Sequence, residues 1–296
     1  MKISKGVFVQ TGVLGKLFIL LAITLLFTLI LTPVISFLPL LNLTETGLLK
    51  LSQLLLSVGV IVLPPIVLAY LISEKPQHFL LLDKKKMNWT DLILVVIFMI
   101  LIIPFINLLG DLNHQLVLPK MFSGIELWMK TSEEQATALT EKFLKVNTFQ
   151  GLLINIFLIS VIPAIGEELY FRGALQGVIR DWKGVKTSIW ITAIIFSTIH
   201  FQFYGFVPRM LMGAFFGYLL VWSENMWLPI VAHFTNNVIA VLFYYLQFNG
   251  SKLPDIDSIG IGNTLWIGLL SGGLGILGIY GLKRRFYLQK EKIANS

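Results

Sequence analysis

Long apolar runs recur along this chain and limit the folds that are open to it. They cover residues 17–41, 51–72, 92–109, 152–178, 188–203, 207–222, 228–248 and 264–282. About 20 apolar residues are enough to cross a membrane as a helix, and helices satisfy their own backbone groups inside lipid. The sequence therefore predicts an all-α polytopic membrane protein with about eight transmembrane helices.

Composition supports a single integral membrane domain over residues 1–296. The chain is 56% hydrophobic and 13% charged, with a mean hydropathy of +0.80, whereas soluble domains carry about 25% charged residues. There is no cysteine, which excludes disulfides, thiolate zinc sites and a cysteine nucleophile.

The basic residues indicate an orientation. In the eight-span arrangement most of the 23 Lys and Arg residues fall on the side of the termini, including Lys2 and the run Lys84 to Lys86. The six on the opposite side are Lys50, Lys120, Lys130, Lys142, Lys145 and Lys252. Because basic residues collect in cytoplasmic loops, we expect both termini to be cytoplasmic in a cell-membrane protein. Cytoplasmic loops then account for the net charge of +7, and we expect no nucleic-acid partner.

One long connection, residues 110–150, separates the third and fourth spans and is expected to be extracytoplasmic. Within it, Ser132 to Gln135 resembles a capping box. Ala136, Leu139, Phe143 and Val146 follow at helical spacing. We predict an amphipathic helix that lies on the membrane surface.

Few polar side chains fall well inside the spans, and these are the candidate functional residues. On the fourth, fifth and seventh predicted spans they include Glu167, Glu168, Arg172, His200, His233 and Asn237. An unpaired charge at the centre of a membrane helix costs roughly 2.5–3.5 kcal/mol on insertion scales. With a rise of about 1.5 Å per residue, the residues lie at similar depths, which predicts one shared polar site.

Helical geometry separates the two glutamates. Glu168 and Arg172 are four residues apart, on one face, which favours an ion pair. Glu167 points about 100° away and is free to act as a base toward water, and His200 is a second proton carrier. His233 and Asn237, also four residues apart, are placed to donate hydrogen bonds to an oxyanion.

These residues form three motifs: Glu167-Glu168-x-x-x-Arg172, Phe196-x-x-x-His200 and His233-x-x-x-Asn237. In this order they resemble the signature of the CPBP family, the CAAX proteases and bacteriocin-processing enzymes that include Rce1-type intramembrane proteases. The resemblance covers about residues 151–248, the expected protease core.

The resemblance implies an eight-helix intramembrane endopeptidase whose site opens toward the cytoplasm and accepts a peptide or protein substrate from that side. It implies that Glu167 and His200 activate water. His233 and Asn237 stabilise the oxyanion, and Glu168 and Arg172 hold the architecture. No cofactor is required in this interpretation.

Two alternatives stay open. The first is a zinc-dependent peptidase with Glu167, His200 and His233 as ligands, since these residue types suit zinc. The second is a transporter or non-enzymatic membrane partner, because charges inside membranes also mark transport paths. For single residues a purely structural role is an alternative to a functional one. Asn237 can join helices through hydrogen bonds, and Arg209 is expected to extend to the outer interface.

Overall fold

The computed structural model describes residues 4–83 and 88–294, which form helices and connecting turns. Lys2 and Lys84 to Lys86, which entered the charge argument, lie outside the described residues. The α-helices are α1 Val13–Ser36, α2 Glu45–Leu56, α3 Leu63–Ile72, α4 Pro76–Phe79, α5 Trp89–His114, α6 Ser123–Leu144, α7 Phe149–Asn155, α8 Ile162–Glu167, α9 Gln176–Thr198, α10 Phe206–Ser223, α11 Trp227–Phe248 and α12 Leu265–Ala294.

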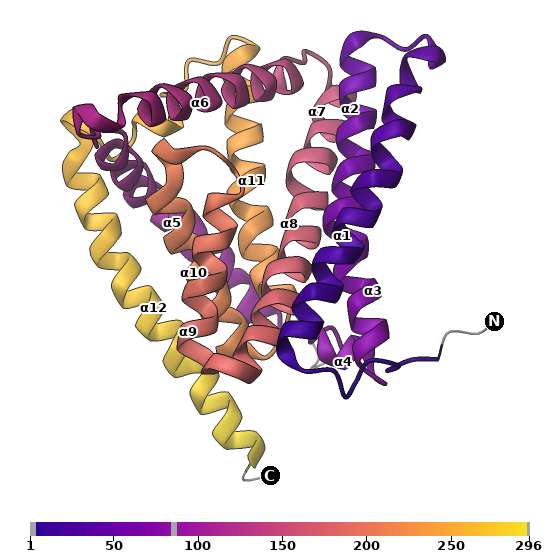
Figure 1. Ribbon diagram of the computed structural model, residues 1–296. Helices are drawn as coiled ribbons and strands as arrows, with labels where there is room; N and C mark the ends of the chain where they lie inside the picture. The colour runs from indigo at the N-terminus through magenta and orange to yellow at the C-terminus, as the bar shows by residue number, and fades with distance from the viewer. Residues whose placement is uncertain (1–3, 84–87, 295–296) are drawn as a thin grey trace.

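Seven helices within the described ranges are long and apolar enough to cross a membrane. The fourth, Phe149–Thr198, has 50 residues and changes direction at Gly184, whose φ of 78° and ψ of 174° are not helical. Figure 1 shows this turn at the end of the molecule where both termini lie. The all-α membrane fold is therefore confirmed, with the fourth and fifth predicted spans joined in one bent helix.

In the described part of the chain, three π-helical segments widen the long helices: Ser57–Val62, Ile156–Val161 and Glu168–Leu175. The first precedes Pro64 and Pro65, which lack backbone donors and so cannot continue a regular ladder. π-Helical segments occur frequently at functional sites, and the third one here begins at Glu168.

Gly166 brings two of these long helices close together. A methyl group at Gly166 would lie 2.8 Å from Cγ2 of Val62 and 3.1 Å from Cγ2 of Ile61. Small residues at such contacts let membrane helices approach closely. The close approach fixes α8 against the helix that runs from α2 to α3, immediately before the candidate base Glu167.

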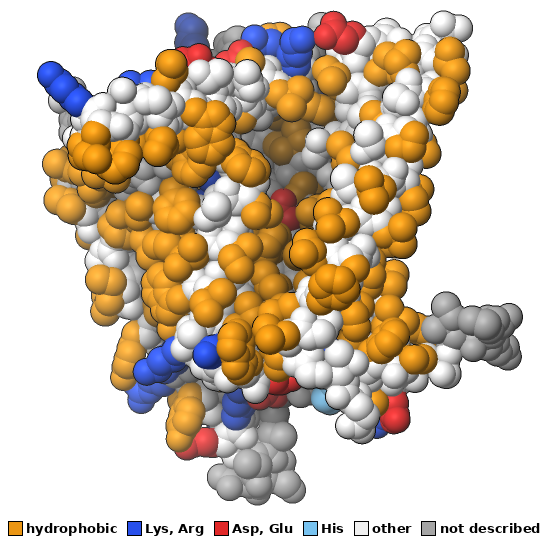
Figure 2. Space-filling model, viewed as in Figure 1, with side chains coloured by type: hydrophobic (Ala, Val, Ile, Leu, Met, Phe, Trp, Pro, Cys, Tyr) orange, Lys and Arg blue, Asp and Glu red, His pale blue; other side chains and the backbone are white. Residues whose placement is uncertain are grey.

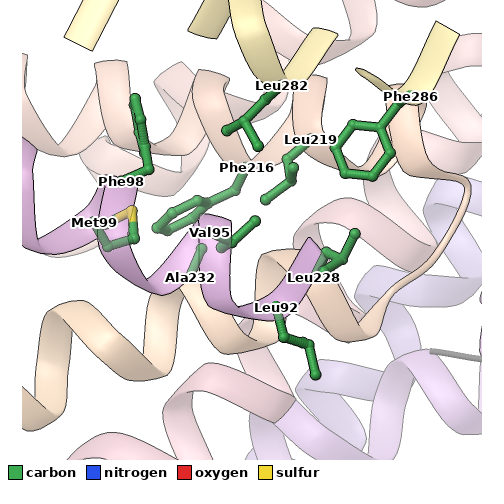
Figure 3. Packing of buried hydrophobic residues seen from close by; sticks show 10 residues of the cluster. All are labelled: Leu92, Val95, Phe98, Met99, Phe216, Leu219, Leu228, Ala232, Leu282 and Phe286. Atoms are coloured by element: carbon green, nitrogen blue, oxygen red, sulfur yellow. The ribbon is translucent and has the colours of Figure 1, made fainter. Parts of the chain in front are cut away.

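An apolar core joins α5, α10, α11 and α12 (Figure 3). Its buried members are Leu92, Val95, Phe98, Met99, Phe216, Leu219, Leu228, Ala232, Leu282 and Phe286. Outside this core the helices expose many apolar side chains, and in Figure 2 these cover the flank of the molecule. Such a surface is stable only in contact with lipid, so the protein is a polytopic integral membrane protein.

Helix α6 lies across the ends of the spans, on the side opposite the termini (Figure 1). A helix is therefore present within residues 110–150, as predicted, and its position on the outer membrane surface stays a prediction. The helix starts at Ser123 and not at the proposed capping box, so Ser132 is an interior helix residue. The capping-box interpretation was wrong because the preceding residues 123–131 also continue the helix.

Candidate active site

The carboxylate of Glu167 faces two histidines across the helix bundle. Its Oε2 atom lies 3.9 Å from Nε2 of His200 and 3.8 Å from Nε2 of His233. This oxygen is buried and has no hydrogen-bond partner among the described residues. Side chains from α8, from the turn after α9 and from α11, far apart in sequence, therefore converge on one point, as their predicted depths indicated.

Glu168 is turned away from this point and is fully buried. Its Oε1 accepts a hydrogen bond of 2.8 Å from Nη1 of Arg172, the predicted ion pair. The same oxygen also lies 2.9 Å from Nδ1 of His233. Sequence reasoning missed this second contact, because the two residues are 65 positions apart and on different helices. Glu168 therefore orients His233 as well as balancing Arg172.

The Arg172 guanidinium sits between aromatic rings. It lies 4.4 Å from the ring centroid of Phe196 and 5.4 Å from that of Phe216, and its Nη2 donates to the carbonyl of Gly213. Desolvated contacts between a guanidinium and a ring are worth about 2 kcal/mol. Phe216 also stacks on the ring of His233 at 5.4 Å, so the apolar core borders the site directly.

His200 lies in a turn and not within a span, which corrects the predicted fifth span. Helix α9 ends at Thr198, five residues before the predicted end at Phe203. Phe201, the next residue after His200, has a φ of +53°, a left-handed conformation that ends a helix and that bulky residues rarely adopt. His200 closes the helix end through its Nδ1, which lies 2.7 Å from the carbonyl oxygen of Phe196.

The turn that carries His200 is held from three sides. Asn113 at the end of α5 donates to the carbonyl of Phe203 and accepts from the backbone of Val207. The hydroxyl of Ser197 donates to the carbonyl of Phe206. Trp128 of α6 packs on Phe203 with ring centroids 5.1 Å apart. A turn fixed in this way holds His200 at a set distance from Glu167.

Arg209 also supports this turn, which packs against α6. Its Nη1 donates to the backbone carbonyl of Gln202, and its Nη2 donates to the side-chain oxygen of the same residue. The guanidinium is thereby held against residues 199–206, where it adds a positive charge near the site.

Asn237 lies one helical turn beyond His233 on α11. Its Nδ2 is 3.2 Å from the carbonyl oxygen of Ile159, and its Oδ1 accepts from Asn236. Asn237 therefore joins α11 to the π-helical segment Ile156–Val161. This contact is the helix-joining role that the sequence analysis gave as an alternative for Asn237. Since the amide carries two protons and one is used here, its assignment as an oxyanion donor stays a prediction.

Hydrogen bonding fixes which nitrogen of each histidine faces the base. Nδ1 of His200 contacts a carbonyl and Nδ1 of His233 contacts a carboxylate, both of which only accept. Each Nδ1 therefore carries a proton, and in a neutral ring Nε2 is left with a free electron pair. Both Nε2 atoms are the ones directed at Glu167.

The distances from Glu167 to the two histidine nitrogens are longer than the distances between ligand atoms in a tetrahedral zinc site. With bonds of about 2.0–2.1 Å, neighbouring zinc ligand atoms lie roughly 3.3 Å apart, whereas Glu167 is 3.8–3.9 Å from the two nitrogens. Among the residues that the structure describes, no group of three His, Asp or Glu side chains is arranged to hold a metal ion. The three side chains do not form a metal cage in this arrangement.

The face of the molecule seen in Figure 2 is hollowed. Figure 2 shows the front face recessed below α6, between α8 and α10, with acidic side-chain atoms visible inside. The exposed fraction of the side chains decreases from His200, at 27%, to Glu167, at 19%, and to His233, at 7%. The site is thus partly open at His200 and closed at the Glu168–Arg172 pair.

Comparison with known proteins agrees with the three motifs. Residues 149–239 match the family described as type II CAAX prenyl endopeptidase Rce1-like. The chain is 29% identical to the membrane-embedded CAAX protease MroQ of Staphylococcus aureus (strain USA300) over 135 residues, which are 43% of this chain and 53% of MroQ. It is 27% identical to the uncharacterized protein YpbD of Bacillus subtilis (strain 168) over 84 residues, 27% of this chain and 40% of YpbD.

The chain spans about half the length, or less, of these curated relatives. No solved structure matches it significantly. Residues 149–239, which contain all six candidate residues, match the Rce1-like family of CAAX endopeptidases, and the family resemblance drawn from the sequence is confirmed.

Proposed function

We propose that this protein is an intramembrane endopeptidase that hydrolyses a peptide bond in a membrane-associated or lipidated peptide or protein. The observation that carries the proposal is the convergence of Glu167 on both histidines within 4 Å, in a chain that crosses the membrane repeatedly. The relationship to the CAAX endopeptidases supports it. Glu167 and His200 activate the water, and His233 with Asn237 stabilises the oxyanion.

A hydrogen bond from His233 to the oxyanion requires a proton on its Nε2. Because its Nδ1 donates to the carboxylate of Glu168, the ring carries a proton on both nitrogens when it acts as this donor. The carboxylate of Glu168 then balances the positive charge of the ring.

The reaction follows from these positions. Glu167 removes a proton from a water molecule, assisted by His200, and the hydroxide attacks the carbonyl carbon of the substrate. The carbonyl oxygen becomes an oxyanion that accepts hydrogen bonds from Nε2 of His233 and from Nδ2 of Asn237. The tetrahedral intermediate then collapses, and the proton held by Glu167 passes to the departing amine.

A substitution at Asn237 separates its two roles. Asn237→Ala is expected to lower kcat about 10²–10³-fold with little change in KM, because an oxyanion donor acts mainly in the transition state. The measurement is cleavage kinetics of the purified variant, with thermal unfolding recorded in parallel. A lower unfolding temperature with unchanged kcat would leave Asn237 only its helix-joining contact with Ile159.

We infer that both termini are cytoplasmic, and the distribution of lysine and arginine supports this orientation. Since the chain has no cysteine, single cysteines test it cleanly. Lys252→Cys is expected to react with a membrane-impermeant maleimide in intact cells, whereas Asp181→Cys should react only after permeabilisation. The reverse pattern would invert the orientation.

The hollow below α6 supports a lateral route from the bilayer to the site. Its recess lies between membrane-spanning helices (Figure 2), so a substrate held in the membrane by a lipid group or an apolar segment can reach Glu167 without leaving the lipid. The sequence-based expectation that the substrate arrives from the cytoplasmic side stays a prediction.

Substrate capture tests the proposed function. A Glu167→Gln variant is expressed in native membranes, and the peptides and proteins enriched with it relative to the parent are identified. The purified parent should then cleave the enriched molecules in proteoliposomes. Transport of these molecules without cleavage would favour the transporter alternative. Activity lost together with stoichiometric metal on chelation would favour the zinc alternative.

A further inference from the structure

A second cavity, separate from the candidate active site, opens between α5, α9, α10 and α12. Its volume is about 560 Å³, within the range of about 300–1,000 Å³ that is typical of ligand sites. The lining is apolar, except that Lys186 and Lys283 also line it. We call this cavity the lateral groove.

One side of the lateral groove lies where α12 packs on α5. A methyl group at Gly278 would lie 2.7 Å from Phe98, and one at Gly272 would lie 2.7 Å from Phe105. These glycines let the two helices approach closely, and their contact presents both phenylalanines to the groove. The groove is therefore built by specific packing of the helices and differs from an ordinary lipid-facing surface.

Helix directions place both lysines at one end of the groove. Lys186 follows the turn at Gly184, at the end of the molecule that holds the termini (Figure 1). Lys283 lies in the later part of α12, which runs toward the same end. Trp222 is next to the last residue of α10, again at this end. The opposite end is lined by Leu109 and other apolar residues.

The two lysines are free to meet a ligand. Both are exposed, and neither forms an ion pair with any residue in the described part of the chain. Trp190 and Trp222 line the groove beside them, as tryptophans do at the level of lipid headgroups. The groove thus has an apolar body, an aromatic border and two positive charges at one end.

We propose that the lateral groove is a binding site for an anionic phospholipid, with an acyl chain against α5 and α10 and the phosphate at Lys186 and Lys283. Charge complementarity selects this occupant: basic pockets between membrane helices on the cytoplasmic side bind anionic headgroups. The proposal is independent of the peptidase activity and concerns the face formed by α9 and α10, the helices on either side of the His200 turn.

Lipid retention by the purified full-length protein tests the proposal. The delipidated protein is incubated with vesicles that contain equal amounts of phosphatidylglycerol and phosphatidylcholine, re-purified, and analysed for bound lipid by mass spectrometry. The parent should retain phosphatidylglycerol preferentially. The Lys186→Gln/Lys283→Gln variant should lose about 25-fold of this preference, since each lysine near an anionic surface contributes roughly a fivefold factor.

Two further variants distinguish the groove from general surface charge. Lys183→Gln/Arg284→Gln removes the same charge from neighbouring positions that do not line the groove, and should keep the preference. Ile279→Trp keeps both lysines but fills the groove at a partly exposed position, and should lower retention of phosphatidylglycerol.

Four results would overturn the proposal. The first three are equal retention of both lipids by the parent, equal losses in the two double variants, and unchanged retention in Ile279→Trp. The fourth is stronger retention of an uncharged isoprenoid than of phosphatidylglycerol, which would assign the groove to a prenyl group.

Discussion

Replacing Glu167 by glutamine is expected to lower kcat about 10²–10⁴-fold, the usual contribution of a general base. Glutamine keeps the shape of the side chain but cannot accept a proton from water. Because Oε2 of Glu167 has no hydrogen-bond partner among the described residues, the substitution breaks no hydrogen bond at that oxygen, although it removes the negative charge beside His200 and His233. The measurement is the cleavage rate of a captured substrate in proteoliposomes, with thermal unfolding as a check of the fold.

A matched control is Glu134→Gln, which removes the same charge from an exposed position on α6. Its rate should equal that of the parent. If Glu167→Gln cleaved the substrate within about twofold of the parent rate, Glu167 would not be the base and the proposed mechanism would fail.

Replacing Arg172 by methionine should produce the largest loss of stability. Both side chains of the Arg172–Glu168 pair are fully buried, and removing one partner of such a pair costs about 3–5 kcal/mol because the other charge is left uncompensated. Arg172→Met is therefore expected to lower the unfolding temperature strongly, as measured in detergent by thermal unfolding.

The double variant Arg172→Met/Glu168→Gln tests the cause of that loss. It leaves no unpaired buried charge, so part of the stability should return. Activity should stay low, because the neutral amide no longer stabilises a protonated His233. An Arg172→Met protein as stable as the parent would show that the pair is not needed for the fold.

The sequence predicted the features that depend on local pattern. Apolar runs of sufficient length located the membrane helices, and the spacing of Glu168 and Arg172 predicted their ion pair, which the structure contains. Depth counting along each span was enough to bring Glu167, His200 and His233 together, because helix rise is nearly constant.

Features that depend on tertiary contacts could not be predicted in this way. The contact of Glu168 with His233 joins different helices, and no local spacing encodes it. The end of α9 depends on the left-handed backbone at Phe201 and on Asn113, which reaches the turn from α5. Hydropathy along the sequence contains no information about either feature, and it therefore places His200 in the interior of a span.

The partner of Arg209 is a further example. From its position near the start of a span, extension to the membrane surface is the usual expectation. Both of its guanidinium contacts are made to Gln202, seven residues earlier. The sequence alone does not identify this partner, because it depends on how the connecting turn folds.

The central claim is that Glu167, between two histidines, directs water onto a peptide bond inside the membrane. The most direct measurement is the product mass when the purified parent acts on a captured peptide in water enriched in heavy oxygen. We predict two fragments whose masses add up to the peptide plus one water, with heavy oxygen in the new carboxyl group, and no such products with Glu167→Gln. A peptide that binds or crosses the membrane intact, or products that form equally with Glu167→Gln, would contradict the account.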